Sequence, residues 1–260
     1  MSDQNLFKFN LSGRVALVTG SSSGLGAGFA NALAQAGARV VLAARRADRL
    51  GEQVEKIHRG GGQALAVQMD VTNEASIRAA YDSAEQNFGM VDTIVLNAGV
   101  AIEKSALDLD LASLNLLLQT NILGVFLAAT EGARRMEIAG PSVKNRGRIV
   151  IIGSITAERV MPYTTVYGAT KAAVRQMGRA LAREWATRGI SVNVIQPGYF
   201  STEMTADGLT GEAGDRFVRS FPRRRLRPQT DLHAPLLLLC SDLAQGITGS
   251  VINVDDGQSL

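Results

Sequence analysis

Short runs rich in Val, Ile and Leu alternate with helix-like segments along the 260-residue chain. The runs that we expect to form strands are residues 14–20, 38–44, 64–70, 91–99, 147–154, 190–198 and 250–257. The expected helices between them include residues 24–37, 46–59, 73–89, 119–138 and 165–187. Nearly continuous apolar strands are buried on both faces, and strands separated by helices run parallel. The alternation therefore predicts an α/β fold, a doubly wound parallel sheet with helices on both faces, formed by residues 1–260 as a single domain.

Composition excludes several classes of partner. Lys and Arg outnumber Asp and Glu by 27 to 24, and this net charge of +3 is too small to indicate a nucleic-acid partner. The single cysteine, Cys240, cannot form an internal disulfide, as expected in a reducing compartment. Residues 1–13 lack the apolar core of a secretory signal, and no uninterrupted apolar run approaches the roughly 18 residues of a membrane span. We therefore expect a cytoplasmic protein without a membrane partner.

A glycine-rich turn, TGSSSGLG, follows the first expected strand and opens a helix at residues 19–26. In doubly wound folds ligands bind beyond the carboxyl ends of the strands, so this turn lies where a ligand is expected. Gly20, Gly24 and Gly26 permit a diphosphate to approach the backbone, and a helix N-terminus favours an anion. The spacing is neither GxGxxG nor that of a P-loop, and glycine turns also occur for packing reasons. The strand before it and the helix after it make it a candidate dinucleotide site.

The end of the second expected strand indicates which dinucleotide is bound. Residues 43–46 read Ala-Ala-Arg-Arg, where a fold that prefers NAD usually carries a carboxylate for the ribose 2′-hydroxyl. Arg45 offers a charge and forked donors to a 2′-phosphate, whereas Arg46 is interpreted as the basic start of a helix. The sequence therefore favours NADP(H) as the cofactor, with NAD(H) as the alternative.

Small polar turns follow the third and fourth expected strands. Asp70 and Val71 follow the third, and Asp70 could accept a hydrogen bond from an adenine amino group. Asn97, Ala98 and Gly99 follow the fourth and offer a small turn for backbone contact with a cofactor. Either turn could equally be a plain cap.

Tyr167 and Lys171 stand four positions apart in an expected helix, which places them on one face, one turn apart. Such a pair is most often a feature of a solvated surface. Ser154, however, ends an expected strand, and Asn121 stands near the start of the expected helix 119–138. An ammonium near a phenol favours the phenolate and lowers a pKa that is ordinarily about 10, which suits proton transfer at neutral pH.

Six features resemble the signature set of the short-chain dehydrogenase/reductase family in its single-domain form. They are the glycine turn, the Asn-Ala-Gly turn at 97–99, Asn121, Ser154, YGATK at 167–171 and PGYFST at 197–202. The resemblance runs from about residue 11 to the C-terminus. It implies a Rossmann-like fold and a catalytic set without a metal ion, namely Asn121, Ser154, Tyr167 and Lys171. In this set Ser154 holds the substrate oxygen, Lys171 also contacts the nicotinamide ribose, and Asn121 anchors a water that relays protons to Lys171.

The resemblance also implies a set of cofactor contacts and a substrate lid. The implied contacts are Gly20, Ser22, Ser23, Gly24, Leu25, Gly26, Arg45, Asp70, Val71, Asn97, Ala98, Gly99, Tyr167, Lys171, Pro197, Gly198 and Thr202. Thr202 is expected to reach the carboxamide of the nicotinamide. Residues 203–221, an irregular stretch with three glycines, are expected to form the lid.

The predicted function is hydride transfer between NADP(H) and a carbonyl or secondary alcohol, with Tyr167 as acid and base. The alternative is a catalytically silent NAD(P)-binding regulatory or scaffold protein. The complete catalytic set favours the enzyme, and the substrate stays open among ketones, β-ketoacyl thioesters and sugar acids. Helices 119–138 and 165–187 carry more apolar residues than one buried stripe needs. Because family members pair these helices across a dimer axis, we expect a homo-oligomer, specifically a tetramer.

Two stretches depart from the family pattern. Residues 222–228, PRRRLRP, contain four arginines where family members usually show one. They are interpreted as a solvated basic loop, with a docking site for an acidic carrier or a phosphorylated substrate as the alternative. The chain ends in VDDGQSL rather than in the usual Gly-Gly segment, and this leaves the packing of the tail open.

Overall fold

The computed structural model describes residues 9–140, 145–201 and 211–260. Its strands form one parallel sheet in the order β3-β2-β1-β4-β5-β6-β7. The chain winds outward from β1 to β3 and then returns to the other side of β1, so its direction reverses between β1 and β4. The predicted fold class is confirmed. The strands are β1 (Val15–Thr19), β2 (Arg39–Ala44), β3 (Gln63–Gln68), β4 (Thr93–Leu96), β5 (Gly147–Ile152), β6 (Ile190–Pro197) and β7 (Val251–Val254).

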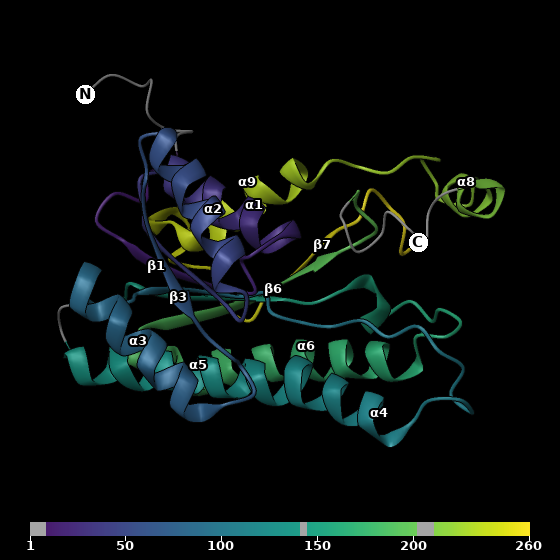
Figure 1. Cartoon of the computed structure of the whole chain (residues 1–260), viewed down its shortest axis with the longest axis horizontal. Helices are drawn as coiled ribbons and strands as arrows, with labels where there is room; N and C mark the ends of the chain where they lie inside the picture. The colour runs from purple at the N-terminus through teal and green to yellow at the C-terminus, as the bar shows by residue number, and fades with distance from the viewer. Residues whose placement is uncertain (1–8, 141–144, 202–210) are drawn as a thin grey trace.

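Helices cover both faces of the sheet and bury an apolar layer on each (Figure 1). One face is covered by α1 (Gly24–Gln35), α2 (Ala47–Arg59) and α9 (His233–Cys240). The other face is covered by α3 (Glu74–Phe88), α5 (Gly124–Ala139) and α6 (Thr165–Trp185). The shorter elements are α4 (Leu111–Leu118), α8 (Gly211–Arg219) and 3₁₀ turns at Ile155–Ala157, Ala186–Arg188, Gln229–Leu232 and Asp242–Ala244.

Helix ends coincide with residues whose side chains or backbone suit them. The Asn73 side chain accepts from the Ser76 N–H at the start of α3, as expected of an N-cap. Gly89 ends the same helix with φ +83°, a conformation that favours glycine. Both residues were expected to bound this helix, and the structure confirms them.

The expected helix 119–138 begins earlier than predicted, at Leu111. Asp110 caps α4 by accepting from the Ser113 N–H, and the helix continues through a π-helical segment, Gln119–Leu123, into α5. Asn121 therefore lies in the π-helical segment within a long helix, not near a helix start. The predicted start was wrong because Leu117 is the one buried residue of α4, so this segment lacks the apolar stripe that identifies a packed helix in a sequence.

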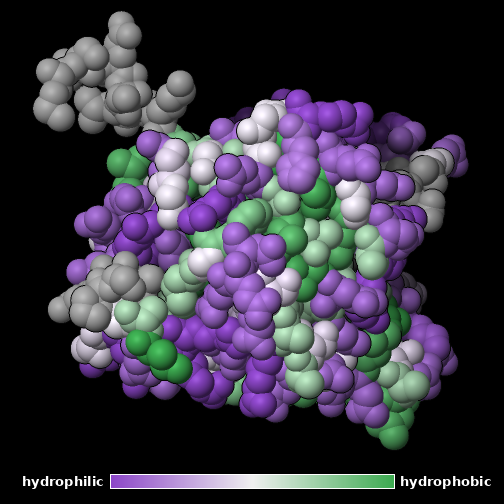
Figure 2. Space-filling view, turned by 60° about the vertical axis from the view of Figure 1, so that its left-hand side comes forward, coloured by the Kyte–Doolittle hydropathy of each residue, from purple (hydrophilic) through white to green (hydrophobic). Residues whose placement is uncertain are grey.

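The combined helix Leu111–Ala139 is long and apolar enough to meet a length-and-hydropathy test for a membrane span, with mean hydropathy 1.6. Its buried side chains pack against the sheet, and Arg135 on it forms ion pairs with Asp82, Glu85 and Glu131. On the face drawn in Figure 2, apolar patches are interspersed with hydrophilic side chains of the described residues and form no continuous band. One side of the helix therefore packs on the sheet, while apolar side chains such as Leu123 and Phe126 are exposed on the other.

Gly26 lets α1 approach the end of β1 more closely than any other residue would permit. A Cβ at Gly26 would lie 2.4 Å from the Gly20 carbonyl oxygen, a backbone atom that cannot rotate away. The glycine turn is therefore required by packing at this position. Gly24 differs, because it combines φ +55° with open space on the side that a Cβ would occupy.

We predict that Gly26→Ala lowers the free energy of unfolding by about 1–3 kcal/mol, because the added methyl group overpacks a fixed backbone contact. Urea unfolding monitored by circular dichroism measures the change. Gly51→Ala is the matched control, since Gly51 lies in α2 with no atom near its Cβ position and gains helix propensity. Equal stability of Gly26→Ala and wild type would contradict the packing argument.

Candidate active site

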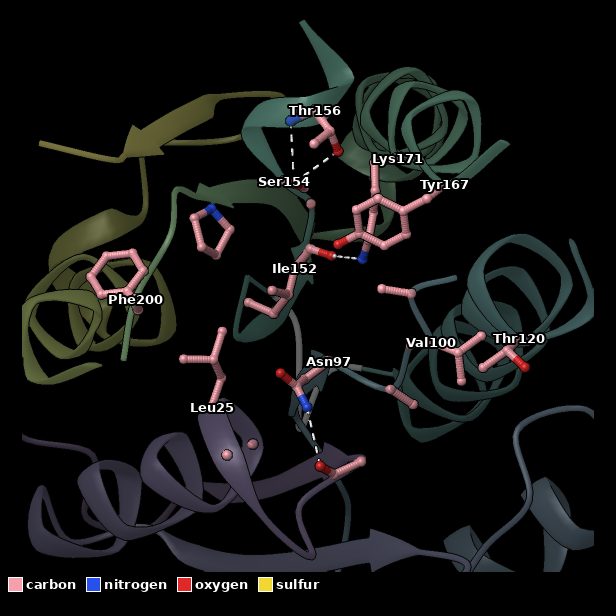
Figure 3. A pocket seen from close by; sticks show the side chains of 18 of the residues that line it. Leu25, Asn97, Val100, Thr120, Ile152, Ser154, Thr156, Tyr167, Lys171 and Phe200 are labelled. Carbon is pink, nitrogen blue, oxygen red and sulfur yellow. Dashed lines mark hydrogen bonds between the residues drawn. The ribbon is translucent and has the colours of Figure 1, made fainter. Parts of the chain in front are cut away.

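A cavity of about 820 Å³ lies beyond the carboxyl ends of the strands and brings most of the predicted residues together (Figure 3). Two predicted residues are not among its lining. Asn121 lies behind the wall, and Thr202 lies outside the described residues. The predicted residues that line it are Gly20, Ser22, Ser23, Gly24, Leu25, Gly26, Arg45, Asp70, Val71, Asn97, Ala98, Gly99, Ser154, Tyr167, Lys171, Pro197 and Gly198.

Hydrogen bonds between Thr19 and Asn97 join the ends of β1 and β4 at the reversal of the sheet. The Thr19 hydroxyl accepts from the backbone N–H groups of Asn97 and Ala98, both at 3.0 Å. The Asn97 amide donates to the carbonyls of Thr19 and Gly20, at 3.0 and 3.2 Å. The Asn97 side chain is therefore committed to holding the glycine turn, while its backbone and the next two residues line the cavity.

Arg46 is the N-cap residue of α2, as its interpretation as a helix start predicted, and its side chain also reaches back to the glycine turn. Its Nη2 donates to the hydroxyls of Ser22 and Ser23, each at 2.9 Å. Arg45 lies beside it in the cavity lining, and its charge contributes to lowering the pKa of Asp70. Two guanidinium groups thus flank the turn at the end of β2. The sequence could not reveal this contact, because it is the parallel pairing of β1 with β2 that brings the turn after β1 close to Arg46 after β2.

The Asp70 carboxylate is held in its ionised form. The Thr72 N–H donates to Asp70 Oδ1 at 2.9 Å and is the main cause of a lowered Asp70 pKa. The Thr72 hydroxyl donates to the same oxygen at 2.8 Å. Oδ2 accepts no hydrogen bond from a described residue and could accept from an adenine amino group.

Ser154, at the end of β5, points its hydroxyl toward Tyr167. Ser154 Oγ accepts from the Thr156 N–H at 3.2 Å and from the Thr156 hydroxyl at 2.9 Å (Figure 3). Since a serine hydroxyl has two acceptor positions and one proton, the Ser154 proton is left for another acceptor. Ser154 also opposes part of the rise in the Tyr167 pKa, so the remaining Ser154 proton lies close to the phenol.

Burial governs the pKa values of both residues in the Tyr-Lys pair. It raises the pKa of Tyr167 to about 12, because a phenolate loses solvation in the cavity wall. It lowers the pKa of Lys171 to about 8. The expected lowering of the tyrosine pKa is therefore not produced by this arrangement. Lys171 Nζ donates to the Ile152 carbonyl at 3.0 Å and lies 5.7 Å from the centre of the Tyr167 ring.

Asn121 fixes the loop that follows the Asn-Ala-Gly turn. Its Oδ1 accepts from the Val100 N–H at 2.8 Å, and its Nδ2 donates to the Val100 carbonyl at 2.9 Å. Nδ2 also donates to the Thr170 hydroxyl at 3.1 Å, and this contact ties the loop to the helix of Tyr167 and Lys171. The relay role predicted for Asn121 stays a prediction.

A family model described as enoyl-(acyl carrier protein) reductase matches residues 20–259. D-threitol dehydrogenase of Mycolicibacterium smegmatis is 35% identical over 257 residues, which cover 98% of this chain and 96% of the relative. The chain belongs to the short-chain dehydrogenase/reductase family. Gluconate 5-dehydrogenase of Burkholderia cenocepacia, solved with NADP and tartrate, matches with a TM-score of 0.91 and 31% identity, covering 97% of this chain and 98% of that one. The 3-ketoacyl-(acyl-carrier-protein) reductase of Brucella melitensis, solved with NADH, matches with a TM-score of 0.88 and 32% identity, covering 96% of this chain and all of the other (100%).

The C-terminal tail, which departs from the family's Gly-Gly ending, packs onto the loop after β6. Gln258 is buried; its Oε1 accepts from the Tyr199 N–H at 2.7 Å, and its Nε2 donates to the Tyr199 carbonyl at 3.2 Å. The Gln258 carbonyl in turn accepts from Arg159, which follows the Ser154 turn. Gln258 thus links two loops of the site, a role that sequence analysis missed because glutamine near a chain end carries no local signal.

Three of the four arginines of residues 222–228 form ion pairs with two aspartates. Arg223 and Arg225 both contact Asp256, at 3.3 and 3.0 Å, and Arg227 pairs with Asp231. They lie around a second cavity, which also includes Asp255. This pairing favours the structural interpretation of the basic loop over an anion-docking site.

We predict that Lys171→Met stabilises the protein without cofactor by about 3 kcal/mol at pH 7, as follows from a shift from 10.5 to about 8. Because the folded-state pKa is the lower one, the unfolded chain binds more protons between these pH values. The cost of burying Lys171 is therefore complete below pH 8 and disappears as the pH rises toward 10.5. Denaturant unfolding at pH 7 and pH 10 measures the difference, with the exposed Lys56→Met as control. A gain of stability that is equal at both pH values would contradict this assignment.

Proposed function

We propose that the protein is an NADP(H)-dependent oxidoreductase that interconverts a carbonyl compound and its secondary alcohol, with Tyr167 as the general acid and base. The observation that carries the proposal is a single cavity that runs from the glycine turn, past Lys171, to Ser154 and Tyr167. A silent binding protein would need the first part of this cavity but not the second. The intact reactive end therefore favours an enzyme over a regulatory or scaffold protein.

The residues present fit a dinucleotide. Gly24, at the N-terminus of α1, leaves open space where a side chain would stand, and the helix end favours a diphosphate there. Gly99 differs, since a Cβ there would lie 3.3 Å from Asn121 Oδ1 and 3.6 Å from Lys171 Nζ, so the glycine keeps this part of the wall clear of a side chain. When bound, the nicotinamide supplies or accepts the hydride. The chain binds the cofactor, orients the substrate oxygen and moves the proton.

Proton transfer in the reducing direction is assigned to the Tyr167 hydroxyl. Its raised pKa keeps the phenol protonated at neutral pH, so that a proton is available as the substrate oxygen gains negative charge. The Ser154 hydroxyl, oriented by Thr156, donates to the same oxygen and stabilises that charge. Lys171 contributes positive charge beside the phenol, and we keep its predicted contact with the nicotinamide ribose.

Two guanidinium groups support the preference for NADP(H) over NAD(H). Arg45 and Arg46 lie where a 2′-phosphate is expected, and Ala44 carries no carboxylate to repel it. Arg46, through its contacts with Ser22 and Ser23, supplies the second base that the glycine turn itself lacks. The related solved structures contain NADP in one case and NADH in the other, so the preference rests on these residues.

Further proposals concern the surroundings of the site. We propose a cytoplasmic location and no nucleic-acid or membrane partner. We also propose that residues 203–221 form a lid over the substrate. Phe217 of α8, within this range, lines the cavity. A homo-oligomer is supported by exposed apolar side chains on the helix Leu111–Ala139, including Leu111, Leu123 and Phe126, and its assignment as a tetramer rests on the family resemblance. Trp185 of α6 is buried in the core and adds nothing to this surface.

We predict that Tyr167→Phe lowers kcat/KM by at least about a hundredfold, because it removes the proton donor and leaves the ring in place. NADPH affinity, measured by fluorescence titration, should change by less than about twofold, because the aromatic ring stays in place and the effect on cofactor binding is indirect. Tyr163→Phe is the control, since Tyr163 is exposed and does not line the cavity. A Tyr167→Phe variant with more than about a tenth of wild-type turnover would remove Tyr167 from the mechanism.

We predict that wild type favours NADPH over NADH in kcat/KM and that Arg46→Ala reduces this preference by about tenfold, the lower end of a charge-assisted contact. Ala44→Asp combined with Arg45→Ala should reverse the preference. Steady-state rates with both cofactors measure each effect. Arg59→Ala, at the far end of α2, serves as control. If Arg46→Ala affects NADPH and NADH equally, Arg46 does not read the 2′-phosphate.

A further inference from the structure

The cavity beyond Ser154 and Tyr167 has mainly apolar walls. Its described lining there includes Val100, Ile155, Met161, Pro162, Tyr199 and Phe217. The aromatic wall is rigid, because Tyr199 and Phe217 pack edge to face at 5.0 Å and Phe217 contacts Phe221 in the same manner at 5.0 Å. This end of the cavity therefore suits a substrate with an apolar body.

Glu103 brings a negative charge to this apolar end. It lines the cavity together with the aromatic wall, whereas the other charged lining residues, Arg45, Arg46, Asp70 and Lys171, belong to the cofactor end. The neighbouring Lys104 is occupied by Asp110 at 3.2 Å, and Arg159 donates to the Gln258 carbonyl. No described residue forms a hydrogen bond or ion pair with the Glu103 carboxylate, which leaves it available to a ligand.

The backbone on both sides of Glu103 is anchored. Before it, Val100 is held by both polar atoms of the Asn121 side chain. Directly after it, the Lys104 N–H donates to the Tyr163 carbonyl at 2.9 Å and ties the loop to the segment before α6. Val100 and Phe200 lie on opposite sides of the cavity (Figure 3). The loop of Glu103 is thus a fixed part of the wall.

The fields of Glu103 and Arg159 both reach this end of the cavity. Besides burial, the exposed Glu103 carboxylate contributes to raising the pKa of Tyr167 and of Tyr199, whereas Arg159 contributes to lowering the pKa of Tyr199. Glu103 lines the cavity and Arg159 does not. A substrate anion at this end would therefore meet a carboxylate and no cation among the described residues that line it.

We propose that Glu103 determines substrate class: the site takes alcohols and ketones with an apolar body and a remote hydrogen-bond donor, hydroxyl or ammonium, and discriminates against remote carboxylates and phosphates. The inference rests on the proposed function, because it assigns the apolar end to the substrate. It removes the sugar acids from the substrates left open by the sequence, and it disfavours acyl groups delivered on an acidic carrier.

The test compares three ligands that share one ring and differ in one group: cyclohexylamine, cyclohexanol and cyclohexanecarboxylate. Their affinities for the enzyme–NADPH complex, in which the alcohol cannot be oxidised, are measured by calorimetry at low and high salt, for wild type, Glu103→Gln and the control Glu52→Gln. Glu52 is exposed on α2, away from the cavity. Reduction of 4-hydroxycyclohexanone and of a panel of other neutral ketones, followed by NADPH absorbance, is measured in parallel.

In wild type we expect the amine to bind at least about fivefold more tightly than the carboxylate, with the alcohol between them, and salt to reduce the difference. Glu103→Gln should reduce the ratio below about twofold, and Glu52→Gln should leave it unchanged. A ratio that is equal in wild type and Glu103→Gln, or failure of both the amine and the alcohol to bind, would overturn the proposal. If neutral ketones are reduced but the amine does not bind more tightly than the carboxylate, only the Glu103 assignment is contradicted. If the amine binds more tightly but no ketone is reduced, only the proposed function is contradicted.

Discussion

The hydrogen bonds between Thr19 and Asn97 are the contact on which the rest of the site depends. They join the carboxyl ends of β1 and β4, where the winding of the sheet reverses and a crevice must open. The Asn97 amide also holds the Gly20 carbonyl, and that carbonyl packs against Gly26 of α1. One polar pair therefore fixes the glycine turn on one side and the start of the Glu103 loop on the other. Because the pair is largely withdrawn from water, losing either partner leaves buried polar groups unsatisfied.

The reactive residues occupy positions that do not favour their own charged forms. Burial raises the pKa of Tyr167 and lowers that of Lys171, so both shifts favour the neutral side chain. Such a pair weakens the fold, and the surrounding core of α5, α6 and β5 supplies the stability that retains it. The same burial leaves Tyr167 protonated and Lys171 mostly charged near neutral pH, as the proposed donation of a proton to a carbonyl requires.

The two ends of the cavity carry opposite charge, and this division follows from the topology. Arg45 and Arg46 follow β2, which lies on one side of β1 in the sheet. Glu103 lies in the loop after β4, which is the neighbour of β1 on the other side. A ligand pair with an anionic cofactor and an uncharged or cationic substrate matches this arrangement. The related proteins are named for different substrates. This is expected if the loops, and not the sheet, determine which substrate binds at this end of the cavity.

The sequence by itself determined the parallel sheet, the position of the glycine turn and the Ser154, Tyr167 and Lys171 set, because strand and helix periodicities and short motifs are local properties. It misplaced the start of the helix of Asn121, since a capped helix interrupted by polar residues resembles a loop until it packs. It also identified Arg46 only as the start of a helix, without its contact with the glycine turn, and it left Gln258 without a role. Their partners, Ser22, Ser23 and Tyr199, lie far away along the chain. Only the tertiary structure brings these groups together, and only it decides that burial is the largest influence on the pKa of Tyr167.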